Sequence, residues 1–143
     1  VHYNFVTQEQ FLTKIKNEEV LEYRKYITNF NNVPDVWYYG TETSSVKDRT
    51  VLVLDLVGLI TLKKMLPEYK ITAIYLDCSD EVRKQRAQQR GSFCEAEWER
   101  RLQDDSVVFN LSLIREHCNY ILDSSCPNDV LLYNVKRILS SKI

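Results

Sequence analysis

Three arginines lie at helical spacing in the middle of the chain, where they could bind a polyphosphate. Arg83, Arg86 and Arg90 are three and four residues apart, so on a helix their guanidinium groups face the same side. A guanidinium is a planar fork that can bind two phosphate oxygens at once. The plainer alternative is a solvated basic helix face, the usual role of a charge run. The cluster is nevertheless the strongest sign of nucleotide chemistry in the sequence.

The flanking segments predict a framework that could hold these arginines. The continuous apolar run at 51–54 and the mostly apolar runs at 71–76 and 119–122 are typical of strands covered on both faces, and helices are expected over 60–65 and 128–143. Apolar strands that alternate with helices indicate an α/β fold with a parallel sheet, in which ligands bind at the carboxyl ends of the strands. Asp55 follows one such strand, and the arginine helix follows another. A second helix, opened by a capping box of Ser92 and Glu95, carries Arg101.

The first fifty residues have a different pattern of apolar and polar residues, which predicts a small β-rich lobe with one helix. Tyr3 and Phe5 alternate with polar residues, so a short strand is expected there. Thr7 and Gln10 have the spacing of a capping box, which predicts a helix to about residue 17. Strands are expected over 20–27 and 36–39, with a polar turn over 28–35 between them.

Length and composition restrict the class of protein. The chain has 143 residues, enough for one domain with a sizeable core. Its net charge of −1 gives no basic field to attract nucleic acid, and no apolar run approaches membrane-spanning length. The four cysteines form no CxxC pair and the two histidines complete no zinc spacing. We therefore expect a cytoplasmic protein with reduced thiols, and neither nucleic acid nor a membrane as its partner.

Taken in order, these segments resemble the guanylate kinase family, the nucleoside monophosphate kinases that phosphorylate GMP. The resemblance covers nearly the whole chain. It rests on the following short motifs: Tyr3–Asn4–Phe5–Val6–Thr7, Val20–Leu21–Glu22, Tyr39–Gly40–Thr41, Asp55–Leu56–Val57–Gly58, and a lid pattern of Arg86, Arg90, Gly91, Arg101 and Leu102. It implies a P-loop-kinase-like parallel sheet with helices on both faces, a small mixed β lobe for GMP, and a helical lid. In this single domain 1–49 would form the lobe, 50–82 and 118–143 the core, and 83–117 the lid.

The resemblance also implies roles for the residues of the lobe. Tyr3 and Tyr39 would donate their hydroxyls to the GMP phosphate. Glu22 would accept hydrogen bonds from the N1–H and the exocyclic amine of guanine, and Thr41 would contact the base edge. Asp55 would help to orient GMP and the magnesium shell. The plainer alternatives are packed strand tyrosines, a surface charge at Glu22, a turn residue at Thr41 and a helix N-cap at Asp55.

The implied reaction is transfer of a phosphoryl group from ATP to GMP, with Mg²⁺ accompanying ATP. Arg86, Arg90 and Arg101 would clamp the transferring phosphoryl group and the ATP phosphates. Phosphoryl transfer needs mainly positioning and charge neutralisation, so arginines are plausible catalytic residues. No residue is assigned as a direct metal ligand.

Departures from the family pattern keep other functions open. The sequence has no G-x-x-x-x-G-K-[ST] motif. We expect the P-loop, its strand and the family's paired arginines to precede Val1 in a longer protein; the alternative is a natural remnant that lacks them. The segment between Glu22 and Tyr39 is longer than usual, and Val57 occupies the position of a family glutamine. One alternative is a kinase for another nucleoside monophosphate. The other is a non-catalytic guanylate-kinase-like domain that binds a peptide, often a phosphorylated one.

Overall fold

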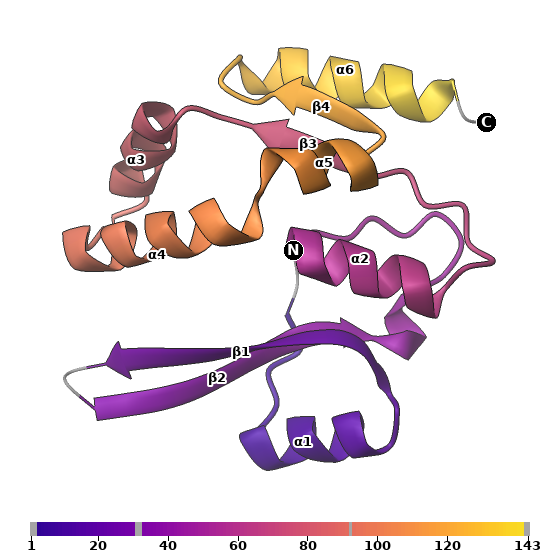
Figure 1. Cartoon of the computed structure of the whole chain (residues 1–143), viewed down its shortest axis with the longest axis vertical. Helices are drawn as coiled ribbons and strands as arrows, with labels where there is room; N and C mark the ends of the chain where they lie inside the picture. The colour runs from indigo at the N-terminus through magenta and orange to yellow at the C-terminus, as the bar shows by residue number, and fades with distance from the viewer. Residues whose placement is uncertain (1–2, 31–32, 92, 142–143) are drawn as a thin grey trace. The chain divides into compact units, whose positions relative to one another are not determined.

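The computed structural model describes residues 3–30, 33–91 and 93–141. The chain divides into two compact units, Val1–Tyr69 and Lys70–Ile143 (Figure 1). Both contain helices and a small sheet, so the predicted α/β class is confirmed. The division into lobe, core and lid that the sequence suggested stays a prediction. No helix among the described residues is both long and apolar enough to cross a membrane.

The first unit opens on the predicted capped helix, α1 (Gln8–Lys16). The capping box is confirmed, because the Gln10 N–H donates to Thr7 Oγ1 at 3.2 Å and the Thr7 N–H donates to Gln10 Oε1 at 2.9 Å. The strand expected around Tyr3 and Phe5 is wrong, since neither residue is in a strand and Phe5 is 90% exposed. Alternation alone does not make a strand, which also needs a hydrogen-bonded neighbour.

An antiparallel hairpin of β1 (Val20–Phe30) and β2 (Val33–Glu42) forms the sheet of this unit. Its pairing extends to Phe30 and Val33, so most of the turn predicted over 28–35 is strand instead. A hairpin connection needs only a few residues, and pairing satisfies the backbone of the remaining ones. Residues 31 and 32, between the strands, lie outside the described residues.

The two faces of the hairpin contact different helices. On one face the ring of Phe11 from α1 stacks on Tyr38 with centroids 5.6 Å apart and meets Tyr23 edge-on at 6.4 Å. Residues on a strand alternate between faces, so Glu22 and Arg24 belong to the opposite face. That face contacts α2 (Leu56–Met65) and its N-cap. A short 3₁₀ turn, η1 (Thr43–Ser45), follows the hairpin.

Two predictions about the segment before α2 are corrected. Residues 51–54 form no strand, and Val51 and Val53 are 86% and 79% exposed. No strand of the described residues pairs with them, and an apolar run alone does not supply that partner. The helix expected at residue 60 begins at Leu56, because the Asp55 side chain accepts the Gly58 N–H and caps it. It ends at Met65, before Pro67.

The second unit alternates strands and helices. Its elements are β3 (Ile74–Asp77), α3 (Asp80–Gln89), α4 (Glu95–Val108), α5 (Leu111–His117), β4 (Tyr120–Asp123) and α6 (Asn128–Ser140). β3 and β4 pair in parallel, with Ile74 opposite Tyr120 and Asp77 opposite Asp123, which confirms part of the predicted parallel sheet. Ile114 on α5 is 2% exposed and anchors the core of this unit. Ser92 lies outside the described residues, and Cys94 is the N-cap of α4.

Candidate functional site

A buried carboxylate lies on the hairpin face that contacts α2. Glu22 on β1 is 6% exposed, and its cross-strand partner Thr41 on β2 is 9% exposed. The Thr41 hydroxyl donates to Glu22 Oε1 at 2.6 Å. A carboxylate has about four acceptor positions, and among the described residues the Thr41 hydroxyl is the donor that fills one of them. Burial shows that Glu22 is not a surface charge, and Thr41 is a strand residue rather than a turn residue.

Gly58 in the first turn of α2 makes room for this carboxylate. A Cβ at Gly58 would lie 3.0 Å from Glu22 Oε2 and 3.2 Å from Asp55 Oδ1. Contacts this short require the neighbouring atoms to move. The absence of a side chain at Gly58 therefore allows the carboxylates of Glu22 and Asp55 to approach the same point of the helix.

Asp55 is fixed by a bidentate ion pair with Arg24. Arg24 Nε donates to Asp55 Oδ2 at 2.7 Å, Arg24 Nη2 donates to Oδ1 at 2.6 Å, and the Gly58 N–H also donates to Oδ1 at 2.6 Å. Burial tends to raise the pKa of Asp55, but the Arg24 guanidinium and the Gly58 N–H outweigh it and the pKa is lowered. The hydrogen bond to Asp55 raises the pKa of Arg24. Asp55 therefore caps the helix. Nothing in the sequence pattern singled out its partner Arg24 as a site residue.

The two predicted tyrosines lie in different surroundings. Tyr39 is directly opposite Arg24 in the hairpin, and its ring centroid lies 6.3 Å from that of Tyr26. Burial raises the pKa of Tyr39, so its hydroxyl stays protonated and able to donate. Tyr3 is 66% exposed, with its ring centroid 6.4 Å from that of Phe5. The structure thus brings Glu22, Tyr39, Thr41 and Asp55 onto one patch of the hairpin and α2. Among the described residues, no hydrogen bond or ring contact joins Tyr3 to this patch.

The carboxylates of this patch already accept hydrogen bonds from protein donors. Within the described ranges, no group of three or more His, Cys, Asp or Glu side chains could hold an ion. Both oxygens of Asp55 already accept donors from Arg24 and Gly58. Direct ligation of Mg²⁺ by Asp55 would require breaking these bonds, so Asp55 does not fit a direct ligand.

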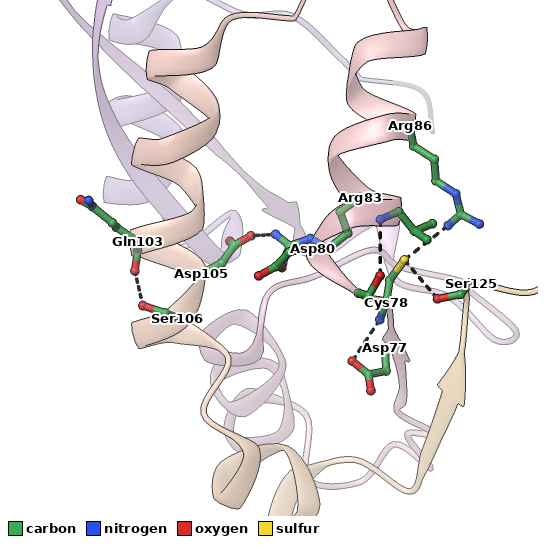
Figure 2. A network of polar contacts seen from close by, with 11 residues as sticks. Asp77, Cys78, Asp80, Arg83, Arg86, Gln103, Asp105, Ser106 and Ser125 are labelled. Carbon is green, nitrogen blue, oxygen red and sulfur yellow. Dashed lines mark hydrogen bonds and ion pairs between the residues drawn. The ribbon is translucent and has the colours of Figure 1, made fainter.

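In the second unit, two arginines of α3 bind neighbouring elements. Figure 2 shows Arg83 extending toward Asp105 on α4 and Arg86 extending toward Cys78. Arg86 Nη2 also donates to the buried Ser124 carbonyl at 2.7 Å, which ties α3 to the end of β4. Arg83 also pairs with Asp80 at 3.0 Å and lies 5.6 Å from the ring centroid of Trp98.

The other two predicted catalytic arginines are exposed. Arg90 is the C-cap of α3 and precedes Gly91, whose φ of 79° ends the helix. Arg101 on α4 has a side chain 63% exposed and donates through Nε to Glu97 Oε1 at 2.7 Å. Hydrogen bonds from Arg100 and then Arg101 lower the pKa of Glu97 to about 2. In the described part of the chain, no contact joins Arg86, Arg90 and Arg101 to one another.

Eight curated proteins that are similar to this chain are named guanylate kinase. The one from Fusobacterium nucleatum is 29% identical over 140 residues, which are 85% of this chain and 70% of the relative. The one from Latilactobacillus sakei is 24% identical over 143 residues, 99% of this chain and 66% of the relative. The one from a Synechococcus strain is 34% identical over 107 residues, 71% of this chain and 54% of the relative.

The chain spans between 43 and 70% of the length of the relatives it matches. No family model matches it, and no solved structure matches it either. The agreement among relatives from unrelated bacteria nevertheless extends over most of the chain. Over most of its length, this chain is similar to proteins named guanylate kinase.

Proposed function

We propose that this chain carries the monophosphate site and the phosphate-binding helices of a guanylate kinase, which transfers the γ-phosphoryl group of ATP to GMP and yields ADP and GDP. The relatives with that name are similar to this chain over most of its length. The observation that supports the proposal most strongly is the buried Glu22 carboxylate, which the Thr41 hydroxyl orients at 2.6 Å.

The chemistry of Glu22 suits guanine. The base edge of guanine presents two parallel donors, N1–H and the exocyclic amine, and a carboxylate presents two acceptors in the same plane. Adenine lacks this pair of donors. A buried charge is costly unless it is hydrogen-bonded, and beyond Thr41 the carboxylate has acceptor positions that a guanine edge would fill. Glu22 would therefore select the base, and the Thr41 hydroxyl would hold the Glu22 carboxylate in position.

The phosphate groups would be bound by side chains that can donate hydrogen bonds to anions. The protonated hydroxyl of Tyr39 lies on the same face as Glu22 and would contact the GMP phosphate. Arg90 and Arg101, exposed on the second unit, would neutralise the charge of the transferring phosphoryl group. Arg86 would position α3, because its guanidinium binds the end of β4. Mg²⁺ would bind together with ATP, as part of that substrate. The proposal also includes the larger parallel sheet and the helical lid that the family resemblance implies.

Titration calorimetry with GMP, AMP, UMP and ATP tests this function. We expect GMP to bind at least about tenfold more tightly than AMP. E22Q replaces one acceptor oxygen with a donor and should weaken GMP binding by about 10- to 100-fold, or ~1.4–2.8 kcal/mol, while ATP binding changes little. Glu9, exposed on α1, supplies the matched control E9Q.

The nucleotide series separates the alternatives. Tighter binding of AMP or UMP than of GMP would favour a kinase for another monophosphate. Equal losses of GMP and ATP in E22Q would remove the role of Glu22 in selecting guanine. A chain that binds none of the nucleotides would contradict the kinase proposal altogether.

A further inference from the structure

We infer that Arg24 recognises the phosphate group of the nucleoside monophosphate and so extends the site beyond base selection. This inference rests on the proposed function, because it assumes that Glu22 binds the base. Nothing in the sequence pattern distinguished Arg24 from its neighbour Lys25. The structure does, because it places Arg24 on the face of the hairpin that carries Glu22.

The geometry of the hairpin places Arg24 beyond the base. It lies two residues after Glu22 on β1, a rise of about 6.6 Å along the strand on the same face. Its cross-strand partner is Tyr39, and the partner of Glu22 is Thr41. A nucleotide whose base contacts Glu22 and Thr41 would extend its sugar and phosphate along the strand. The next pair of side chains that it meets is Arg24 and Tyr39, both of which donate hydrogen bonds.

The guanidinium has donors to spare. Within the described residues, three of its five N–H groups are engaged, two by Asp55 and one by the Tyr23 carbonyl at 3.0 Å. One N–H on each terminal nitrogen remains, and the side chain is 24% exposed. Two N–H groups on adjacent nitrogens are the arrangement that binds two phosphate oxygens.

Charge makes a cation necessary at this position. Glu22 and Asp55 bring two carboxylates close to Gly58, and together they would repel an incoming phosphate. Arg24 is the cation bound at this pair in the described part of the chain, and its hydrogen bond to Asp55 raises its pKa. Asp55 acts as a positioning residue, because its two oxygens hold the guanidinium in one orientation before the ligand arrives.

Binding of GMP and of guanosine, compared by titration calorimetry, measures the contribution of the phosphate. In the unmodified chain we expect GMP to bind at least about tenfold more tightly than guanosine. R24Q should reduce GMP affinity by at least about tenfold and leave guanosine affinity within about twofold, since it removes a single charge-assisted interaction. Lys25, exposed on the opposite face, supplies the matched control K25Q, which should change neither affinity.

R24Q leaves the Asp55 carboxylate without its ion-pair partner, which could destabilise the fold. The double variant R24Q/D55N replaces both charges with neutral amides and so avoids an unpaired charge. We expect it to show the same selective loss of GMP affinity. A parallel loss of GMP and guanosine in both variants would make Arg24 purely structural and overturn the inference. So would an unchanged GMP affinity, or an unmodified chain that binds guanosine as tightly as GMP. If the unmodified chain bound neither compound, the proposed function itself would fail, which is distinct from a failure of Arg24 alone.

Discussion

The guanidinium of Arg24 binds both carboxylate oxygens of Asp55, at 2.7 and 2.6 Å. This pair joins β1 to the first turn of α2, because Asp55 is also the N-cap of that helix. The side chains are 24% and 21% exposed, so the pair is only partly screened by water. It therefore fixes the distance between the strand that carries Glu22 and the glycine that makes room for its carboxylate.

The contribution of the Arg24–Asp55 ion pair should be visible in how the free energy of unfolding depends on pH. The pKa of Asp55 is lower in the folded chain than its ordinary value of 3.8. A group with a depressed folded pKa contributes stability above its unfolded pKa, and that contribution is lost as the pH falls through the folded value. We expect the free energy of unfolding to decline with a steeper slope below about pH 4 in the unmodified chain than in D55N. Chemical denaturation at a series of pH values measures both slopes.

D55N also separates the ion pair from the helix cap. Asparagine caps a helix about as well as aspartate, so the loss at neutral pH should be about 1–3 kcal/mol and should come from the ion pair. Asp48, an exposed aspartate of the same unit, supplies the control D48N, which we expect to have no such effect. Identical acid slopes for D55N and the unmodified chain would show that Asp55 does not contribute to acid sensitivity.

The substitution G58A should affect the site more than the fold. Alanine is favoured over glycine within a helix by up to about 1 kcal/mol, which opposes the cost of a Cβ 3.0 Å from Glu22 Oε2. We therefore expect a net change in unfolding free energy of less than about 1 kcal/mol. GMP affinity should nevertheless fall several-fold, because the buried carboxylate must move away from the position that Thr41 gives it.

A double-mutant cycle with E22Q shows whether the two effects are coupled. If Gly58 acts through Glu22, G58A should weaken GMP binding much less in the E22Q background than in the unmodified chain. Additive losses in the double variant would mean that Gly58 affects binding by another route.

Local signals in the sequence were sufficient for α1 and for the capping role of Asp55, but they did not predict α5. The capping box of Thr7 and Gln10 involves residues three apart, so it can be identified without tertiary information. The same holds for Asp55, whose role as a helix cap was weighed as an alternative. The helix itself begins earlier than predicted, because the apolar residues after Asp55 fit a helix as well as a continued strand.

The remaining features depend on contacts between distant residues. Residues 51–54 have the composition of a buried strand but pair with no strand of the described residues, so composition alone misled. Arg24 and Lys25 are adjacent cations, and alternation shows only that they occupy opposite faces. The position of Asp55, 31 residues further along the chain, decides which of them joins the site. The roles of Arg86, Arg90 and Arg101 in catalysis stay predictions.

Arg90 offers the clearest test of those roles. Among the described residues its side chain has no ion-pair partner, and it lies exposed at the end of α3. Its removal should therefore leave the unfolding free energy within about 0.5 kcal/mol. In contrast, R86A would also break the hydrogen bond to Ser124 and so destabilise the fold. We expect R90A to lower the turnover number by at least about tenfold, equivalent to ~1.4 kcal/mol of transition-state stabilisation.

The control for R90A is R115A, which removes an exposed arginine from α5 in the same unit. A loss of turnover confined to R90A, with equal thermal stability for both variants, would place the Arg90 guanidinium at the reacting phosphates. Equal turnover for both variants would assign Arg90 to the solvated face of the helix, the alternative that its spacing left open. The distinction matters for the whole cluster, because Arg83 binds Asp105 and Arg86 binds the Ser124 carbonyl. Of these three arginines, only Arg90 could bind a ligand without first breaking a side-chain contact among the described residues.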